Sequence, residues 1–276
     1  MRNLYKNFGL ESILGMLLCF VSCGKYEQRG DKMYYSYWPN ESGKVERIIS
    51  EADLSSFKVL KGKVYAKDKN RVYYRGLVIS DADVNTFKPL SDTYSVDYKH
   101  IFWEKHLLST ANPESFKILK DEYSLDSERV YYRKDTLKEA NPATFRTIGD
   151  YYAKDANHVY SQGYLQTQVS DAASFELISS DGCGHKWARD KNFYYHYKSR
   201  IEADYATFTL IDKGKDGYAK DKNHVYYSYC LSKPIIVEGA DPKTFKMVGK
   251  YKNIGQDKNG YYWSGEWTPK ENLRNL

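Results

Sequence analysis

Short runs of apolar and aromatic residues recur along the chain, and polar clusters of similar length separate them. The run Val72–Tyr74 follows the polar cluster Asp68–Arg71, and the run Val64–Lys67 precedes that cluster. β-Branched and aromatic residues favour strands. The Asp-Lys-Asn start of the cluster favours a tight turn, because Asp accepts downstream backbone N–H groups and Asn tolerates positive φ. The pattern therefore predicts a β-hairpin whose two short strands flank the polar cluster.

The hairpin pattern occurs seven times, and we call the residue that starts each polar cluster the turn aspartate. The turn aspartates of repeats 1 to 7 are Asp68, Asp97, Asp126, Asp155, Asp190, Asp221 and Asp257, at intervals of 29, 29, 29, 35, 31 and 36 residues. A partial copy, Asp31–Tyr35, precedes them and is expected to cap the array. A nearly fixed period is typical of proteins that stack one small unit many times.

A second motif, Asp/Asn-x-x-Ser/Thr-Phe, alternates with the hairpins, and we call it the linker motif. It ends at Phe57, Phe87, Phe116, Phe145, Phe175, Phe208 and Phe245, and it starts at Asp53, Asp83, Asn112, Asn141, Asp171, Asp204 and Asp241. Pro follows the first residue in three copies. Asp or Asn before Pro is typical of a helix start. We therefore predict three strands and one helical turn per repeat, with the phenylalanine buried.

The residue five positions after each turn aspartate is aromatic, and the residue two positions before it is small. Tyr73 and Ala66 hold these positions in repeat 1. If the turn has two or four residues, the alternation of side chains along strands places the small residue opposite the ring, where it leaves room for a neighbouring ring. The same register pairs Tyr65 with Tyr74 on the other face. A three-residue turn would shift this pairing by one.

These elements predict an all-β protein, a tandem array of seven short antiparallel β-units with one helical turn per repeat, open or superhelical. A closed ring that resembles a β-propeller is the alternative. The common interval of 29 residues is short for a propeller blade, which usually has four strands and ~40–45 residues. If successive repeats stacked at the spacing of hydrogen-bonded strands, about 4.8 Å, the seven carboxylates would repel one another. Sheets that pack face to face, about 10 Å apart, avoid this repulsion and are therefore favoured.

The N-terminus has the pattern of a targeting segment. Arg2 and Lys6 precede the apolar stretch Ile13–Val21, which is too short to span a bilayer as a stable helix. The following Ser-Cys-Gly resembles the bacterial lipobox and predicts that Cys23 is lipidated and anchors the protein to a membrane. An ordinary secretory signal with an incidental cysteine is the alternative. The predicted parts are a lipoprotein signal peptide at 1–22, a linker with a partial repeat at 23–45, a repeat domain at 46–267 and a tail at 268–276.

The recurring motif resembles that of the DKNYY family, a group of bacterial repeat proteins. The resemblance covers about Asp31 to Trp263, and the motif positions coincide in all seven copies. Repeats 2, 3 and 4 depart from the motif within the turn, where they carry Tyr98-Lys99, Ser127-Glu128 and Ala156-Asn157. The resemblance implies an exported, often membrane-attached protein with no established activity, and it assigns no catalytic residue.

Composition restricts the function classes. Aromatic residues make up 16 % of the chain, which argues against disorder. The net charge of +6 arises from 42 basic residues interleaved with 36 acidic ones, so we expect no nucleic-acid partner. Outside the targeting segment the only cysteines are Cys183 and Cys230. In an exported protein they are candidates for a disulfide bond, and two unpaired thiols are the alternative.

No standard catalytic, nucleotide-binding or zinc-binding motif is present, so we predict no catalytic residue, no metal and no cofactor. One position carries candidate chemistry, the third after the turn aspartate. It holds Arg71, His100, Arg129, His158 and His224. Stacked in register, these side chains would form an anion-binding row. A solvated turn position that tolerates any polar side chain is the alternative.

Repeat arrays offer long surfaces and few pockets. We therefore expect a non-enzymatic scaffold lipoprotein of the cell envelope that binds an envelope protein or glycan. A glycan- or peptidoglycan-binding module is the alternative, and a hydrolase with a site in the divergent segment Asp181–Trp187 is a weaker one. Gly24 after Cys23 is not the Asp that retains lipoproteins in the inner membrane, which favours an outer-membrane anchor.

Overall fold

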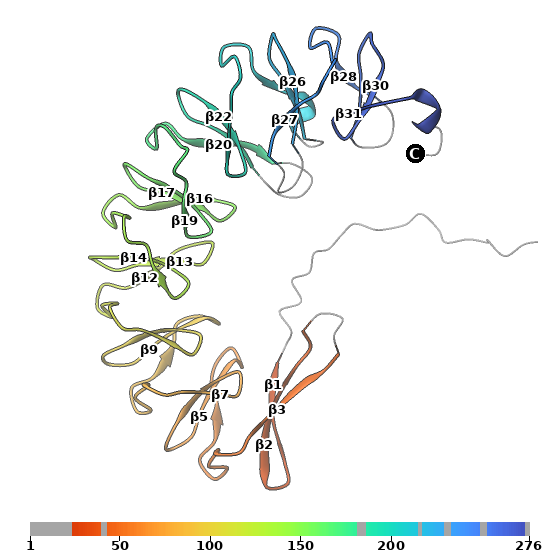
Figure 1. Cartoon of the computed structure of the whole chain (residues 1–276). Coiled ribbons are helices and arrows are strands. Elements are labelled where there is room, and N and C mark those ends of the chain that lie inside the picture. The colour runs from red at the N-terminus through yellow and green to blue at the C-terminus, as the bar shows by residue number, and fades with distance from the viewer. Residues whose placement is uncertain are drawn as a thin grey trace, which may run out of the picture. The chain divides into compact units, whose positions relative to one another are not determined.

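The computed structural model describes residues 24–39, 43–180, 186–214, 217–228, 233–248 and 253–273. These residues form short strands and turns, with no α-helix among them. The strands make eight small antiparallel sheets in tandem, and each sheet contains only strands that are consecutive in sequence (Figure 1). No sheet closes into a barrel. The prediction of an all-β tandem array is confirmed.

The chain divides into two compact units, residues 1–113 and 114–276. The first unit contains a three-stranded sheet and the sheets of repeats 1 and 2. The three-stranded sheet consists of β1 (Lys25–Arg29), β2 (Lys32–Tyr37) and β3 (Val45–Ile49). The other two sheets consist of β4 (Lys58–Val59), β5 (Tyr65–Lys67), β6 (Val72–Tyr74) and β7 (Leu77–Ile79), and of β8 (Lys88–Pro89), β9 (Tyr94–Val96), β10 (Ile101–Trp103) and β11 (His106–Leu108).

The second unit contains the four-stranded sheets of repeats 3 to 7. Repeats 3 and 4 comprise β12 (Lys117–Ile118), β13 (Tyr123–Leu125), β14 (Val130–Tyr132) and β15 (Asp135–Thr136), then β16 (Arg146–Gly149), β17 (Tyr152–Lys154), β18 (Val159–Ser161) and β19 (Tyr164–Leu165). Repeats 5 and 6 comprise β20 (Glu176–Ser180), β21 (Lys186–Arg189), β22 (Tyr194–His196) and β23 (Ser199–Ile201), then β24 (Thr209–Leu210), β25 (Tyr218–Lys220), β26 (Val225–Tyr227) and β27 (Ile235–Ile236). Repeat 7 comprises β28 (Lys246–Met247), β29 (Ile254–Gln256), β30 (Tyr261–Trp263) and β31 (Glu266–Thr268), and the short 3₁₀ segments are η2 (Ile211–Gly214) and η3 (Lys270–Leu273).

Each complete repeat has four strands, so the prediction of three was wrong. In repeat 1 the extra strand β7 pairs with β6 in an antiparallel register. The reversal between them is a two-residue turn in which Arg75 and Gly76 both have positive φ, 46° and 76°. Turns of this kind match the twist of a hairpin. Arg is uncommon at positive φ, and the sequence pattern therefore did not indicate a turn here.

The predicted helical turn is present as a single hydrogen-bonded turn in the linker motif. In repeat 1 the Ser56 N–H donates to the Asp53 carbonyl oxygen at 3.2 Å and to the Asp53 carboxylate at 3.1 Å. This is the hydrogen bonding of a helix start. The turn goes no further because β4 begins at Lys58, directly after the linker phenylalanine.

The register of the central hairpin follows the predicted pairing. Ala66 lies opposite Tyr73, and Tyr65 lies opposite Tyr74 with ring centroids 5.1 Å apart. The same small-to-aromatic pairing holds in the other six repeats. It arises because the polar cluster forms a four-residue turn. The prediction that was conditional on turn length is confirmed.

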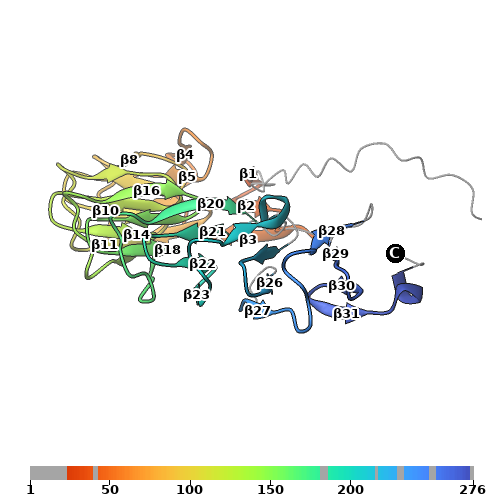
Figure 2. The ribbon, with the colours of Figure 1, turned by 90° about the horizontal axis from the view of Figure 1, so that it is seen from above.

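The core lies between successive sheets, and the linker phenylalanine fills it. Phe145 packs between the Tyr123 ring of repeat 3 and the Tyr160 ring of repeat 4, with centroid distances of 5.5 and 5.8 Å. The small residue Ala153 lies opposite Tyr160 and belongs to the same buried cluster. The sheets that contain β14 and β17 follow one another in Figure 1, and they overlap when seen from above in Figure 2. Repeats 3 and 4 therefore bury aromatic side chains against each other.

A lysine directly before the turn aspartate adds polar contacts between repeats. The Lys154 ammonium of repeat 4 donates to the carbonyl oxygens of Ala172, Ala173 and Phe175 in the next linker at 2.7–2.9 Å. Burial lowers the pKa of this lysine. Lys67 and Lys220 make the same kind of contact with the linkers that follow them. These bonds join each of the three repeats to the linker that follows it.

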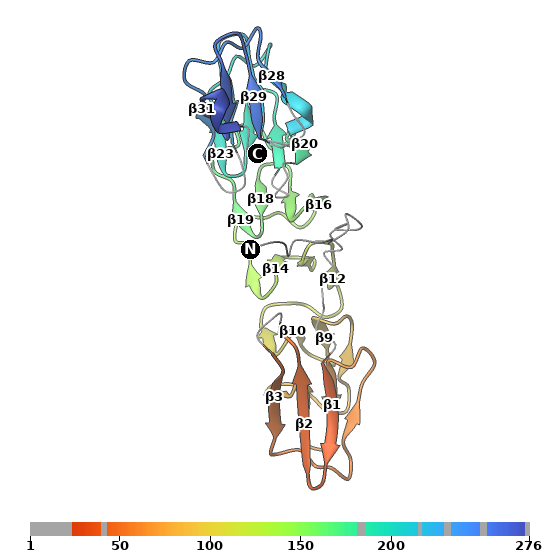
Figure 3. The ribbon, with the colours of Figure 1, turned by 90° about the vertical axis from the view of Figure 1, so that its right-hand side faces the viewer.

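The partial N-terminal copy forms the sheet β1–β3, whose strands lie side by side in Figure 3. Its Met33 and Tyr35 pack with Ala66 and Tyr73 of repeat 1. The Tyr26 hydroxyl donates to the Val64 carbonyl oxygen and accepts the Gly76 N–H, each at 3.0 Å. This sheet therefore covers a face of repeat 1 that would otherwise be exposed.

Candidate functional site

The most regular polar feature is the buried carboxylate of the turn aspartate. In repeat 1 one oxygen of Asp68 accepts the N–H groups of Asn70 and Arg71 at 2.7 and 2.8 Å. The other accepts the Tyr73 hydroxyl at 2.7 Å and the Asp53 N–H at 2.9 Å. Four donors satisfy a carboxylate that has almost no contact with solvent. The aspartate thus ties the hairpin turn to the linker of the same repeat.

The environment favours the ionised form of five of these carboxylates. Burial alone raises the pKa of Asp68, but the hydrogen bonds from Tyr73 and from backbone N–H groups outweigh it and lower the pKa overall. The same balance lowers the pKa of four other turn aspartates, Asp97, Asp155, Asp190 and Asp221. A carboxylate whose oxygens are all engaged and whose pKa is lowered is a poor proton donor at neutral pH. The turn aspartates are therefore structural.

We expect the lowered pKa values to make the fold sensitive to acid. A carboxylate with a lower pKa in the folded state stabilises it above the unfolded-state pKa of about 3.9, and this contribution is lost as the pH falls through the folded-state value. Urea midpoints should be constant from about pH 7 to about pH 5 and fall steadily below about pH 4. A midpoint unchanged at about pH 3 would contradict the role assigned to these carboxylates.

The linker motif completes the same network. Ser56 Oγ accepts the Lys69 N–H at 3.0 Å and donates to the Asp53 carboxylate at 2.8 Å, and Lys69 Nζ lies 2.8 Å from the other Asp53 oxygen. The ion pair recurs in repeats 5, 6 and 7. Where repeat 2 has Tyr98 in place of the lysine, its N–H still bonds to the linker hydroxyl of Thr86 at 3.1 Å. The backbone bond therefore tolerates the motif departures in repeats 2 to 4.

The predicted anion-binding row consists of side chains that each have a partner in their own repeat. Arg71 pairs with Glu51 at 3.1 Å. The other four contact Asp97 (His100, 3.3 Å), Glu128 (Arg129, 2.8 Å), Asp155 (His158, 3.5 Å) and Tyr226 (His224, 3.4 Å). Most of these partners are acidic, so an anion would have to compete with a carboxylate. Anion binding by this row stays a prediction.

Three predicted site residues, Cys23, Cys183 and Cys230, lie outside the described residues, as do the signal peptide at 1–22 and most of the divergent segment. Lipidation and the disulfide therefore stay predictions. Within the described ranges, no three His, Cys, Asp or Glu side chains are grouped so that they could hold a metal ion. None of the described helices has the length and hydropathy needed to cross a bilayer.

A histidine–serine pair that the motifs did not indicate joins repeats 5 and 6. Ser228 Oγ lies 2.6 Å from His196 Nδ1, and the Trp187 ring lies 4.6 Å from the imidazole. This is the kind of pair that a hydrolase requires. Both side chains have an exposed fraction of 0 %, however, so the pair has no surface open to a substrate. The available signal was that His196 occupies a position where most repeats have Tyr or Trp.

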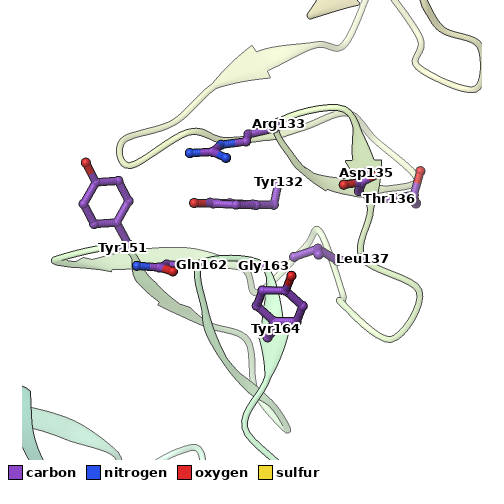
Figure 4. A pocket seen from close by; sticks show the side chains of 9 residues that line it. All are labelled: Tyr132, Arg133, Asp135, Thr136, Leu137, Tyr151, Gln162, Gly163 and Tyr164. Atoms are coloured by element: carbon purple, nitrogen blue, oxygen red, sulfur yellow. The ribbon is translucent and has the colours of Figure 1, made fainter. Parts of the chain in front are cut away.

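A surface hollow of about 610 Å³ lies between repeats 3 and 4 within the second unit (Figure 4), and we call it the hairpin groove. It is lined by Tyr132, Arg133, Asp135, Thr136, Leu137, Tyr151, Gln162, Gly163 and Tyr164. The turn Gln162-Gly163 between β18 and β19 has positive φ at both residues, 49° and 80°. A β-carbon on Gly163 would lie 2.6 Å from the Tyr132 ring, so only glycine allows this close packing.

The groove combines aromatic rings with planar polar groups. Arg133 Nε donates to Glu122 at 2.5 Å, and the guanidinium lies 5.3 Å from the centre of the Tyr132 ring. Burial is the main reason that the pKa of Tyr132 is raised to about 12. Tyr151 and Tyr164, in contrast, are 45 % and 66 % exposed. A volume of this size lies in the range of small-ligand sites.

Fold and polar network together define a tandem β-repeat protein whose recurring motif residues hold the repeats together. The DKNYY family matches residues 26–164, 78–199 and 150–266, which overlap and extend across most of the chain. The chain belongs to the DKNYY family. Searches of the curated proteins and of the solved structures found no match.

Proposed function

We propose that this protein is an exported lipoprotein of the cell envelope that acts as a non-enzymatic scaffold. One observation carries the proposal: the recurring motif residues form the same internal network in repeat after repeat. In repeat 6, for example, Asp221 accepts N–H groups from Asp204, Asn223 and His224 and the hydroxyl of Tyr226. The arrangement matches that of repeat 1. Side chains engaged in this way support binding surfaces but perform no chemistry.

The surface built on this common frame differs from one repeat to the next. The two-residue turns after the third strand read Arg75-Gly76, Glu104-Lys105, Arg133-Lys134, Gln162-Gly163, Tyr197-Lys198 and Ser264-Gly265. A constant interior with variable turns is typical of repeat proteins that bind extended partners. This supports an envelope protein or a glycan as the partner, and it supports neither nucleic acid nor a cofactor.

The proposed anchor is a lipid on Cys23 that holds the array at a membrane, the outer membrane in our proposal. We expect Cys23→Ala to move the protein from the membrane fraction to the soluble fraction and to abolish incorporation of a labelled fatty acid. Cys19→Ala is the matched control, because Cys19 lies in the same segment but outside the lipobox-like sequence. If Cys23→Ala stays membrane-bound and labelled, the anchor assignment is wrong.

Binding is tested with the full-length chain in mild detergent. The protein is mixed with purified envelope sacculi and, separately, with detergent-solubilised envelope proteins, and the bound fraction is measured against concentration. We expect saturable binding to one of them without a change in the mass of its components. Absence of saturable binding to both would contradict the scaffold role, and release of cleaved products would contradict its non-enzymatic nature.

A further inference from the structure

We propose that the hairpin groove binds an uncharged glycan chain. The inference rests on the proposed scaffold function and names the ligand class of one surface. Sugars present apolar C–H faces with a rim of hydroxyl groups. A site for them therefore needs open aromatic faces beside hydrogen-bonding groups that are not already satisfied within the protein.

The open aromatic faces belong to Tyr151 and Tyr164. Most tyrosines of the array are buried in the stacks between sheets, whereas these two rings reach solvent from the same groove (Figure 4). Asp150 and Tyr151 form the turn between β16 and β17 with φ of 52° and 62°. The same kind of turn precedes β13 in repeat 3, where Asp121 and Glu122 have φ of 58° and 67°, so it belongs to the repeat. Here it holds the Tyr151 ring at the groove.

The hydrogen-bonding groups belong to Asp135, Thr136 and Gln162. All three are exposed, and within the described part of the chain their side chains form no hydrogen bond or ion pair. Together they offer donors and acceptors: the carboxylate accepts, and the hydroxyl and the amide do both. Such a set matches the mixed donor and acceptor character of sugar hydroxyl groups.

Charge favours an uncharged ligand over an acidic one. Arg133 is the only cation among the lining residues, and it is already bound to Glu122 at 2.5 Å. Asp135, on the same hairpin as Arg133, carries a negative charge with no ion pair in the described part of the chain. An acidic glycan would meet this carboxylate within the lining, whereas Lys198, the cation over the Tyr164 ring, lies outside it.

The surroundings of the groove favour a polymer over a single sugar. Lys198 of repeat 5 lies 5.1 Å from the centre of the Tyr164 ring. Lys198 also lines the next hollow, and Gln168 of that hollow lines a third, of about 620 Å³, together with Arg200. A chain bound in both larger hollows would cross the middle one, of about 10 Å³, on the surface of the second unit.

The equivalent position in the first unit shows what the groove would be without open rings. There Tyr74 and Arg75 line a hollow of about 160 Å³ with Glu104 and Lys105. Tyr74 is buried, and its hydroxyl donates to Glu104 at 3.2 Å. The ring and the hydroxyl are already engaged, which leaves little for a ligand. The hollow of the first unit thus lacks the open rings of the hairpin groove.

The test uses the full-length chain and three probes: cellohexaose, chitohexaose and the acidic oligomer of galacturonate. Calorimetry should detect binding of at least one uncharged probe. We expect Tyr151→Ser and Tyr164→Ser each to weaken it about 5- to 10-fold, because each removes one stacking face. Tyr98→Ser is the matched control, since Tyr98 is 71 % exposed on a turn of the first unit and should leave affinity unchanged.

Exposed rings contribute little to the fold, so the melting temperatures of the variants should match that of the parent chain and exclude misfolding. The proposal is overturned if neither uncharged probe binds, if only the acidic probe binds, or if the double variant Tyr151→Ser/Tyr164→Ser binds as tightly as the parent. If the double variant still binds the envelope as the parent chain does, the hairpin groove is not the binding site, and the scaffold role is unaffected. Absence of envelope binding by the parent chain would contradict the scaffold role itself.

Discussion

Replacing Asp190 with Ala is expected to lower the free energy of unfolding by about 3–5 kcal/mol. One oxygen of this carboxylate accepts the N–H and the hydroxyl of Ser170, the N–H of Asp171 and the hydroxyl of Tyr195 at 2.7–3.0 Å. The other accepts the Asn192 N–H at 2.8 Å. Alanine would leave these donors without an acceptor in a buried place, and each unsatisfied donor costs about 1–3 kcal/mol before relaxation.

Urea unfolding followed by circular dichroism measures this loss. Asp190→Asn keeps the shape and one acceptor oxygen, so about half of the loss is expected. Asp135→Ala is the matched control, because Asp135 is exposed and its side chain makes no hydrogen bond within the described ranges. If Asp190→Ala and Asp135→Ala cost the same, the turn aspartate is not what joins hairpin and linker.

Replacing Phe175 with Ala is expected to cost about 3–5 kcal/mol as well. Its ring lies between the rings of Tyr152 and Tyr195, with centroid distances of 6.3 and 5.9 Å, and forms part of the core between repeats 4 and 5. Removing it leaves a cavity in the cluster that joins the two sheets, where the Lys154 bonds to the linker remain. Because each repeat is stabilised by its neighbours, we also expect the single unfolding transition to broaden or divide.

Differential scanning calorimetry detects both effects. Ile118→Ala serves as the control, since Ile118 is an apolar residue of the same unit that is 40 % exposed, and its loss should cost less than about 1 kcal/mol. A Phe175→Ala protein with the melting temperature of the control would show that the linker phenylalanine does not hold neighbouring repeats together.

Much of the fold could be predicted because its determinants are local. The turn aspartate and the residues around it lie within a few positions of each other, so one copy already specifies the four-residue turn and the pairing of Ala66 with Tyr73. Repetition then removed the ambiguity of a single short motif. The linker hydrogen bonds follow from the same spacing, because Asp53 and Ser56 reach the turn of their own repeat.

The missed features depend on contacts between repeats. Strand β7 requires positive φ at Arg75 and the packing of Gly76 against Tyr35, which lies 41 positions earlier in the sequence. The pair of His196 and Ser228 joins β22 of repeat 5 to the residue that follows β26 in repeat 6. The hairpin groove likewise combines the turns of two repeats, and its residues share no motif. Sequence periodicity describes what the copies have in common, whereas these features arise where the copies differ.

The phenylalanine that sits between adjacent sheets has a consequence for how such chains change length. Within the second unit, Phe145, Phe175, Phe208 and Phe245 are each buried between rings of two successive repeats, so removing or adding the stretch between two equivalent codons recreates a junction that already exists elsewhere. In repeats 3 and 4 that stretch is 29 residues long. A gene of this kind gains or loses whole copies by recombination without having to evolve a new interior, and the reach of the protein can vary while its stability per copy stays the same.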